Sequence, residues 1–283
     1  MRRFALLVLL LALLGGCGND ETGAPVASTE TETTPPASTA ETETVAEEVT
    51  SFGVYFFRGE KVAPAYRAVP QTEGVGTAAL EALLAGPTAD ETSLGLTSTI
   101  PAGTRLLGLG VKDGVATVDL SREFESGGGS LSIMGRLAQL TFTLTQFPTI
   151  EGIWVAVQGE PVYALGGEGA VINEPLTRAH LAELTPLILV EHPAVGETVT
   201  SPVPVSGTAS VFEATLRVRL EGPDGESLWE DTVTASEGAP GRGSFAVEVP
   251  FVATGQGKIV AFSPSAKDGS EQHTFEVEVE LAP

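Results

Sequence analysis

Short apolar runs separated by turn sequences predict several strands in the first half of the chain. Arg58-Gly59-Glu60 follows one such run and Lys112-Asp113-Gly114 follows another, and both sequences favour tight turns. In the run before the second turn, Leu and Val alternate with glycines, which is the period of a strand. The predicted strands cover residues 52–57, 62–69, 107–111, 115–120 and 152–157.

Two segments have helical spacing instead. Residues 78–85 place leucines on one face, and Gly86-Pro87 ends this helix because Gly suits a helix C-terminus and Pro cannot continue it. A clearer helix ends before Pro148 and carries an apolar stripe at three- and four-residue spacing, formed by Ile133, Leu137, Leu140, Leu144 and Phe147. The order of strands and helices predicts a small α/β domain, with two helices on one face of a sheet.

From Leu187 onward the apolar period changes to two. Turn clusters such as Gly222-Pro223-Asp224-Gly225 separate the runs, and about seven short strands in roughly 95 residues are typical of an immunoglobulin-like β-sandwich. Six of these runs are residues 202–207, 214–221, 228–235, 244–250, 258–263 and 274–281. The chain as a whole is therefore expected to be of the α+β class.

A linker is expected between the two domains, over residues 166–186. Gly166-Gly167-Glu168-Gly169 is interpreted as a flexible joint. Residues 174–184 are expected to form a short helix, whose inward side chains would be Leu176, Ala179, His180 and Leu184.

The N-terminus has the anatomy of a secretory signal peptide. Met1-Arg2-Arg3 precedes an apolar run from Phe4 to Leu14, and a run of this length rises only ~16 Å as a helix, against ~30 Å of hydrocarbon. Leu14-Gly15-Gly16-Cys17 resembles the bacterial lipobox, which implies cleavage between Gly16 and Cys17 and lipidation of Cys17. The alternative is a chance cysteine in an ordinary signal peptide.

Residues 17–51 are expected to be a tether. Residues 18–51 hold eight acidic residues and no Lys or Arg, so they cannot bury enough apolar surface to offset the entropy of ordering. We interpret them as a disordered acidic spacer that keeps the folded domains away from the bilayer.

Charge and composition exclude several classes of function. Lys and Arg number 15 against 37 Asp and Glu, for a net charge of −22, and no basic cluster suited to phosphates is present, so a nucleic-acid partner is not expected. The single Cys excludes an intrachain disulfide, and the three His residues are too dispersed to suggest a zinc site. We therefore expect no metal and no other cofactor.

No catalytic signature emerges from the sequence. Asp119, Glu123 and Glu125 could be proposed as an acid/base set, but no spacing fixes a pair of them around a bond, and solvated acids are the better interpretation. The glycine-rich segments lack the further residues that a dinucleotide site, a phosphate loop or a nucleophile elbow requires.

One aromatic set suggests a recognition surface. Trp154 should point away from the helices, and either Tyr55 with Phe57 or the opposite face of the first strand would join it on the open side of the sheet. Rings on an open sheet could stack on sugars or contact a partner. The favoured alternative is plain packing, over Gly108 and Gly110 or under the second domain.

Four segments in order resemble the sporulation and spore germination (GerMN) domain: Ala79–Pro87, Ile100–Thr104, Asp113–Ser121 and Thr143–Pro148. The resemblance covers about residues 75–165. It implies a small α/β fold without established enzymatic activity, found in bacterial envelope and sporulation lipoproteins and proposed to act in wall-linked binding or assembly.

Segments of the second domain resemble the immunoglobulin-like domain of bacterial spore germination, which commonly follows a GerMN domain. These segments are His192-Pro193, Gly207–Ala209, Val211–Ala214, Arg242–Phe245 and Ser265–Ser270. The expected organisation is a signal peptide (1–16), the lipidated Cys with its tether (17–51), a GerMN-like domain (52–165), a linker (166–186) and a sandwich (187–283).

The resulting expectation is a lipoprotein on the extracytoplasmic face of a bacterial cell membrane, held by the lipid on Cys17. It would act as a non-catalytic binding or assembly module, with peptidoglycan or an envelope protein as its partner. A protein–protein adaptor for an envelope sensor or assembly complex is the alternative, and a wall hydrolase ranks last.

Replacement of Cys17 tests the anchor. Two acyl chains hold a protein on a bilayer where one chain is marginal, so Cys17→Ala should move the protein from the membrane pellet to the soluble fraction. The measurement is fractionation after a salt wash. A variant that still pellets with membranes would show that the anchor lies elsewhere.

Overall fold

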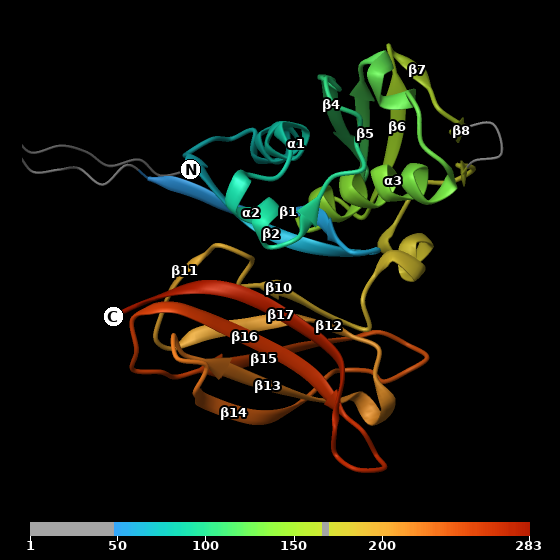
Figure 1. The fold of residues 1–283 in the computed structure, drawn as a ribbon. Helices are drawn as coiled ribbons and strands as arrows, with labels where there is room; N and C mark the ends of the chain where they lie inside the picture. The colour runs from blue at the N-terminus through green and yellow to red at the C-terminus, as the bar shows by residue number, and fades with distance from the viewer. Residues whose placement is uncertain (1–47, 166–169) are drawn as a thin grey trace, which may run out of the picture. The chain divides into compact units, whose positions relative to one another are not determined.

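The structure, a computed structural model, describes residues 48–165 and 170–283. The predicted signal peptide with Gly16 and Cys17, nearly all of the predicted tether and the glycine-rich joint lie outside the described residues. The described residues belong to one compact unit, in which an α/β domain is followed by a β-rich domain (Figure 1). The predicted α+β class is confirmed.

The N-terminal strands are divided between two sheets, whereas the sequence analysis expected one small sheet. β1 (Val49–Arg58) and β2 (Lys61–Pro70) form an antiparallel hairpin, and β3 (Leu96–Thr97) pairs with the other edge of β1 at its C-terminal end. The second sheet has the order β4 (Leu106–Lys112), β5 (Val115–Leu120), β6 (Gly152–Val157) and β7 (Glu160–Pro161), with β5 and β6 parallel. A further short pair joins β8 (Ala164–Leu165) and β9 (Ala170–Val171).

Both predicted helices form. α1 (Val75–Ala85) ends at Gly86, which adopts a φ of 82° and donates its N–H to the carbonyl of Leu83. α3 (Ser130–Leu144) contacts β1 of the first sheet and β6 of the second, so it lies against both sheets. A short helix that was not predicted, α2 (Ala89–Ser93), begins with a capping box between Thr88 and Glu91. A 3-10 turn, η1 (Arg122–Glu125), precedes α3.

A polar face of α3 replaces a neighbouring strand along part of β1. Gln139 and Thr143 of α3 and Gln146, just after its C-terminal end, are spaced by four and three residues. Their side chains therefore lie on the same side of the helix. Gln146 accepts from the N–H of Gly53 at 2.9 Å and donates to its carbonyl at 2.6 Å. Thr143 accepts from the N–H of Tyr55 at 3.1 Å, and Gln139 donates to the Tyr55 carbonyl at 3.2 Å. These side chains supply hydrogen-bond partners for the backbone groups on the edge of β1 that faces away from β2. A strand of the second sheet is therefore not needed at this edge, which explains why the two sheets stay separate.

A buried arginine on the same helix holds the loop before it. Arg136 is 2% exposed and donates to the carbonyls of Phe124 at 2.6 Å, Ser126 at 2.9 Å and Gly127 at 2.6 Å, and to that of Thr99 at 3.2 Å. Burial lowers the pKa of Arg136. These carbonyl oxygens supply the hydrogen bonds that a buried guanidinium requires, so Arg136 orders residues 124–127.

The second domain is a two-sheet sandwich (Figure 1). One sheet has the order β10 (Ile188–His192), β12 (Val203–Ala209) and β15 (Gly243–Val249). The other has the order β11 (Thr198–Thr200), β17 (Glu271–Ala282), β16 (Gly255–Pro264), β13 (Thr215–Glu221) and β14 (Ser227–Thr234). The six strands predicted for this domain are confirmed. Strand alternation is clear in β17, where Phe275, Val277, Val279 and Leu281 are buried between exposed or half-buried glutamates.

The linker region forms a 3-10 helix, η2 (Arg178–Leu184), within the segment predicted as helical. Leu176 and Leu184 are buried as expected. The inward placement predicted for Ala179 and His180 is wrong, because both side chains are exposed. His180 instead closes the start of η2, where its Nδ1 accepts from the N–H of Thr177 at 3.1 Å.

Backbone pairing joins the sandwich to the outer edge of the hairpin. Tyr66 N–H donates to the carbonyl of Val195 at 3.0 Å, and Val195 N–H donates to that of Pro64 at 3.2 Å. One cluster of buried apolar residues runs from β1 through η2 to β17, so the two domains share a continuous core.

The side chains that satisfy β1 generate a stability prediction. Gln139→Leu leaves the buried Tyr55 carbonyl and the Thr99 N–H, which Gln139 accepts at 2.8 Å, without partners. The free energy of unfolding should fall by about 2 kcal/mol or more, because each orphaned buried group costs about 1–3 kcal/mol. Urea unfolding measures this change. Leu131→Ala, on an exposed position of the same helix, is the matched control and should change stability by no more than about 0.5 kcal/mol. Equal losses in the two variants would contradict the role assigned to Gln139.

Candidate functional site

The aromatic surface proposed from the sequence is not formed. Tyr55 and Phe57 are 2% and 3% exposed, and Trp154 is half-buried against the core. Both faces of β1 are covered: Val54 and Phe56 on one face are buried, and the Tyr55 ring on the other packs against Phe142 of α3 with a centroid distance of 5.4 Å. Phe57 lies against Gly135 of α3, where an added Cβ would come within 3.3 Å of the ring. Tyr55 and Phe57 therefore pack against α3 and are not part of an open recognition surface, and among the described residues no aromatic ring lies against Gly108 or Gly110, the packing considered as the alternative. The role of Trp154, which stays partly exposed, remains a prediction.

Tyr55 takes part in a polar contact between the two domains. Its hydroxyl donates to Glu191 on β10 at 2.7 Å, and Arg178 on η2 donates to both Glu191 oxygens at 2.9 and 2.8 Å. Arg178 also lies over the Phe142 ring at 4.7 Å. Burial is the main cause that raises the pKa of Tyr55, with the Glu191 carboxylate adding to it, so the phenol remains a donor.

Arg178 keeps its charge in this setting. Burial alone would lower the pKa of Arg178, but the neighbouring Tyr55 and Glu191 raise it. A second contact joins the domains through Arg58, which donates to the Glu276 carbonyl and to Glu278, both at 2.8 Å. The contacts of Arg178 and Arg58 are charge-assisted hydrogen bonds across the domain junction. Because such bonds are directional, they fix the orientation of the two domains as well as linking them.

The acidic residues considered from the sequence do not form a pair around a cavity. Asp119 accepts from the N–H of Gly159 at 2.9 Å, while Glu123 and Glu125 are exposed. Hydrogen bonding from Ser121 and from its own backbone lowers the pKa of Glu123, which keeps it ionised. Within residues 48–165 and 170–283, no group of three or more His, Cys, Asp or Glu is arranged to hold a metal ion.

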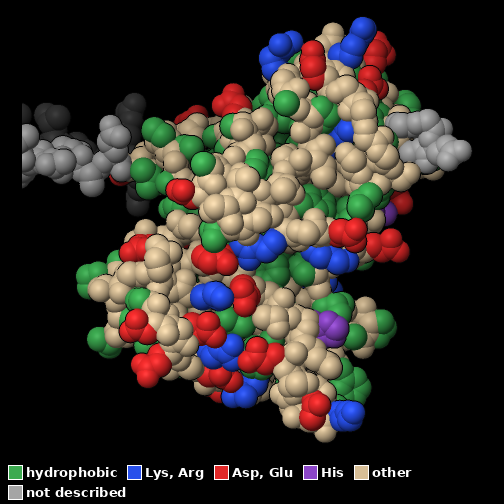
Figure 2. All heavy atoms as spheres, viewed as in Figure 1, with side chains coloured by type: hydrophobic (Ala, Val, Ile, Leu, Met, Phe, Trp, Pro, Cys, Tyr) green, Lys and Arg blue, Asp and Glu red, His purple; other side chains and the backbone are tan. Residues whose placement is uncertain are grey.

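Charged side chains on the sandwich are mixed in sign. On the face shown in Figure 2, Lys and Arg alternate with Asp and Glu over the second domain. Arg217 pairs with Glu230 at 2.7 Å, and Arg219 pairs with Glu221 at 2.9 Å and Glu271 at 2.6 Å. These partly exposed ion pairs pair charges of opposite sign on the sandwich and present no reactive group, so we do not assign them a functional role.

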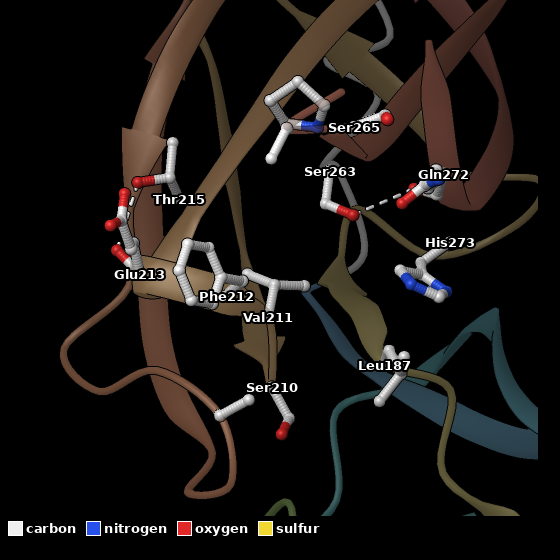
Figure 3. Close-up of a pocket in the computed structure, with 13 residues that line it drawn as sticks. Leu187, Ser210, Val211, Phe212, Glu213, Thr215, Ser263, Ser265, Gln272 and His273 are labelled. Carbon is white, nitrogen blue, oxygen red and sulfur yellow. Dashed lines mark hydrogen bonds between the residues drawn. The ribbon is translucent and has the colours of Figure 1, made fainter. Parts of the chain in front are cut away.

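A pocket of about 550 Å³ lies at one end of the sandwich (Figure 3). Leu187, Val211 and Phe212 contribute apolar surface, and Gln272 and His273 lie across from Phe212 in the close-up. Phe212 is 74% exposed, an unusual state for a phenylalanine. The pocket therefore presents a large aromatic ring beside polar groups, a composition typical of contact sites.

The backbone around Phe212 is strained. Glu213, Ala214 and His273 adopt φ values of 54°, 55° and 55°, in the left-handed region that non-glycine residues seldom occupy. The other non-glycine residues with positive φ in the described part of the chain, Asp113 and Gln158, lie in turns directly before a glycine. Strained residues held by their surroundings tend to cluster at functional sites, which makes this end of the sandwich the best candidate.

A neighbouring loop holds the strained segment in place. The Val211 carbonyl accepts from the N–H of Ala214 at 3.2 Å and from that of Ala239 at 2.9 Å. A Cβ on Gly238 would come within 2.7 Å of the Ala214 nitrogen, so only glycine permits this close approach. The strain at Glu213 and Ala214 is thus fixed by backbone contacts outside the η3 turn (Phe212–Ala214).

Two of the hydroxyl groups in the pocket are bonded to backbone carbonyls. Ser263 donates to the Gln272 carbonyl at 3.3 Å, and Thr215 donates to the Glu213 carbonyl at 3.1 Å. An activated serine would instead donate to a base such as His273. The arrangement is suited to binding through apolar contact and hydrogen bonds.

Val211–Ala214 resembles the family sequence, but the sequence does not indicate that Phe212 is exposed. The only signal in the sequence was an aromatic residue in a short segment between strands, and this does not show whether its side chain is exposed. In the described part of the chain, none of the helices is long and apolar enough to cross a bilayer.

Comparison with known proteins bears on both domains. The family model for sporulation and spore germination (Germane) matches residues 53–163. The model for the immunoglobulin-like domain of bacterial spore germination (Gmad2) matches residues 187–270. A search of curated proteins finds no match to this chain.

Solved structures include two similar to this one. The first GerMN domain of the sporulation protein GerM from Bacillus subtilis is 24% identical, with coverage of 47% of this chain and 98% of that one and a TM-score of 0.40. The tandem GerMN domains of the same protein are 20% identical, with coverage of 72% and 62% and a TM-score of 0.42.

Taken with the α/β domain, the sandwich and their order along the chain, the two family matches show that this protein contains a sporulation and spore germination (GerMN) domain followed by the immunoglobulin-like domain of bacterial spore germination.

Proposed function

We propose that this protein is a membrane-anchored lipoprotein of the bacterial envelope whose two domains form a non-catalytic binding or assembly module. The lipobox-like sequence ending in Cys17 supports the anchor, and the acidic residues that follow support a spacer between lipid and folded domains. Both matched families belong to sporulation and spore germination, which supports a role in the envelope.

The observation that carries the binding role is the exposed Phe212 ring on a strained turn. Burial of a Phe side chain contributes about 1.5–3 kcal/mol, and this contribution is lost in the free protein while the ring stays in water. The left-handed conformations of Glu213 and Ala214 add a further cost to folding. A partner that covers Phe212 would gain the free energy of removing the ring from water, so the exposed ring favours binding.

The chemistry of the pocket supports recognition without reaction. Apolar groups from Leu187, Val211 and Phe212 lie next to the amide of Gln272 and the ring of His273. Hot spots of binding commonly combine an aromatic anchor with a few polar neighbours in this way. The partner would be peptidoglycan or an envelope protein, and the protein–protein adaptor remains the alternative form of the same proposal.

Replacement of Phe212 tests the proposal. Detergent-solubilised full-length protein is sedimented with purified peptidoglycan, and in parallel its partners are crosslinked in intact cells. Phe212→Ser should weaken capture of the partner about tenfold or more, because the burial energy of the ring is lost. Val252→Ser removes a fully exposed apolar side chain of the same sandwich outside this pocket, and it should bind like wild type.

The two assays separate the alternatives. Sedimentation with peptidoglycan identifies a wall-binding module, whereas a crosslinked protein without glycan affinity identifies an adaptor. Release of soluble fragments from peptidoglycan would contradict the non-catalytic proposal, and equal capture of the Phe212 and Val252 variants would contradict the role of the pocket.

A further inference from the structure

A second pocket, of about 350 Å³, lies where α3, η2 and the sandwich meet. Phe142 of α3, Ala179 and Ala182 of η2 and Thr208 of β12 line it, together with Arg178 and Arg242. Its volume falls in the range of pockets that hold small ligands. Two guanidinium groups in one small pocket are notable in a chain whose net charge is −22.

The positive charge of this pocket is only half neutralised. Arg178 forms an ion pair with Glu191 at 2.8 Å. Arg242 donates to the carbonyl of Pro186 at 2.6 Å and to the carbonyl and hydroxyl of Thr208 at 3.3 and 3.1 Å. These acceptors are neutral, and within the described residues no carboxylate lies within ion-pair distance of Arg242.

Electrostatics at Arg242 agree with this imbalance. Burial lowers the pKa of Arg242, the nearby Glu191 carboxylate opposes this effect, and the Arg178 guanidinium adds to it. Arg178 and Arg242 against Glu191 leave one uncompensated positive charge beside the pocket. A bound monoanion would neutralise it, and an ionised partner makes a stronger hydrogen bond to a guanidinium than a neutral one does.

The apolar residues that line this pocket indicate the uncharged part of a ligand. The Phe142 ring and the methyl groups of Ala179 and Ala182 are apolar and small enough to leave room beside the guanidinium groups. A single negative charge on a short aliphatic stem matches this combination. A planar carboxylate also matches the fork of donors on arginine.

We propose that the pocket between η2 and the sandwich binds the terminal carboxylate of a short peptide with small aliphatic side chains, and that Arg242 is the residue that receives it. The ligand would contact both domains, because Phe142 belongs to the first and Arg242 to the second. This site is separate from the pocket at Phe212, so the two proposals can fail independently.

The test is a calorimetric titration of full-length protein in detergent with N-acetyl-alanyl-alanine. The free acid should bind saturably, and the same dipeptide with a C-terminal amide should bind about tenfold more weakly or worse, because charge-assisted hydrogen bonds are lost. Added NaCl should weaken binding of the acid more than that of the amide. The L,L and D,D forms distinguish a protein C-terminus from a wall stem peptide that ends in D-alanine.

Two variants locate the site. Arg242→Gln removes the charge and should weaken binding of the acid about tenfold or more. Ala182→Leu is at an exposed position and fills the pocket without altering either guanidinium, so it keeps the test valid if Arg242→Gln does not fold. Ala85→Leu, at an exposed position of α1 away from the pocket, is the matched control and should bind like wild type.

Three results would overturn the proposal: equal binding of acid and amide, no saturable binding of either, or wild-type affinity in the folded pocket variants. Phe212→Ser should retain full binding of the dipeptide, which keeps this outcome distinct from the result at the other pocket.

Discussion

The fold of the first domain depends on how the backbone of β1 finds hydrogen-bond partners on both edges. β2 pairs along one edge, but on the other edge β3 covers only the last two residues. Gln139 and Thr143 of α3, with Gln146 just after the helix, supply the partners for Gly53 and Tyr55. This constraint places α3 against β1, and the same helix then carries Phe142 to the domain junction, where Arg178 lies over its ring.

The junction combines a structural charged contact at Glu191 with a second arginine, Arg242, that we propose binds a ligand. Glu191 accepts from Tyr55 of the first domain and from Arg178 of the linker, so one carboxylate serves two donors. Arg242 lies near this group but depends on neutral acceptors. The buried charge of Glu191 thus has an oppositely charged partner, whereas that of Arg242 has only neutral ones. This difference is the reason for assigning Arg178 a structural role and for proposing Arg242 as the binding residue.

Periodicity in the sequence predicted most elements of the fold, because strand alternation and the apolar stripe of α3 are local signals. The division into two sheets could not be predicted, since Gln139 and Thr143 meet β1 across more than 80 residues and their spacing alone does not indicate a strand as partner. Alternation placed Tyr55 and Phe57 on one face but could not show that Phe142 and Gly135 cover it. The exposure of Phe212 could not be predicted either, because the turn around it has positive φ at Glu213 and Ala214, where sequence rules would expect glycine.

The position of β1 also determines how mechanical force would pass through the protein. Val49, near the end of the segment predicted as a tether, begins the strand, and Tyr55 and Arg58 of the same strand contact the second domain. Tension applied through the proposed anchor would therefore enter the described structure at the start of β1, which is hydrogen-bonded to β2 along its whole length. The second domain would receive that load within ten residues of the point of entry.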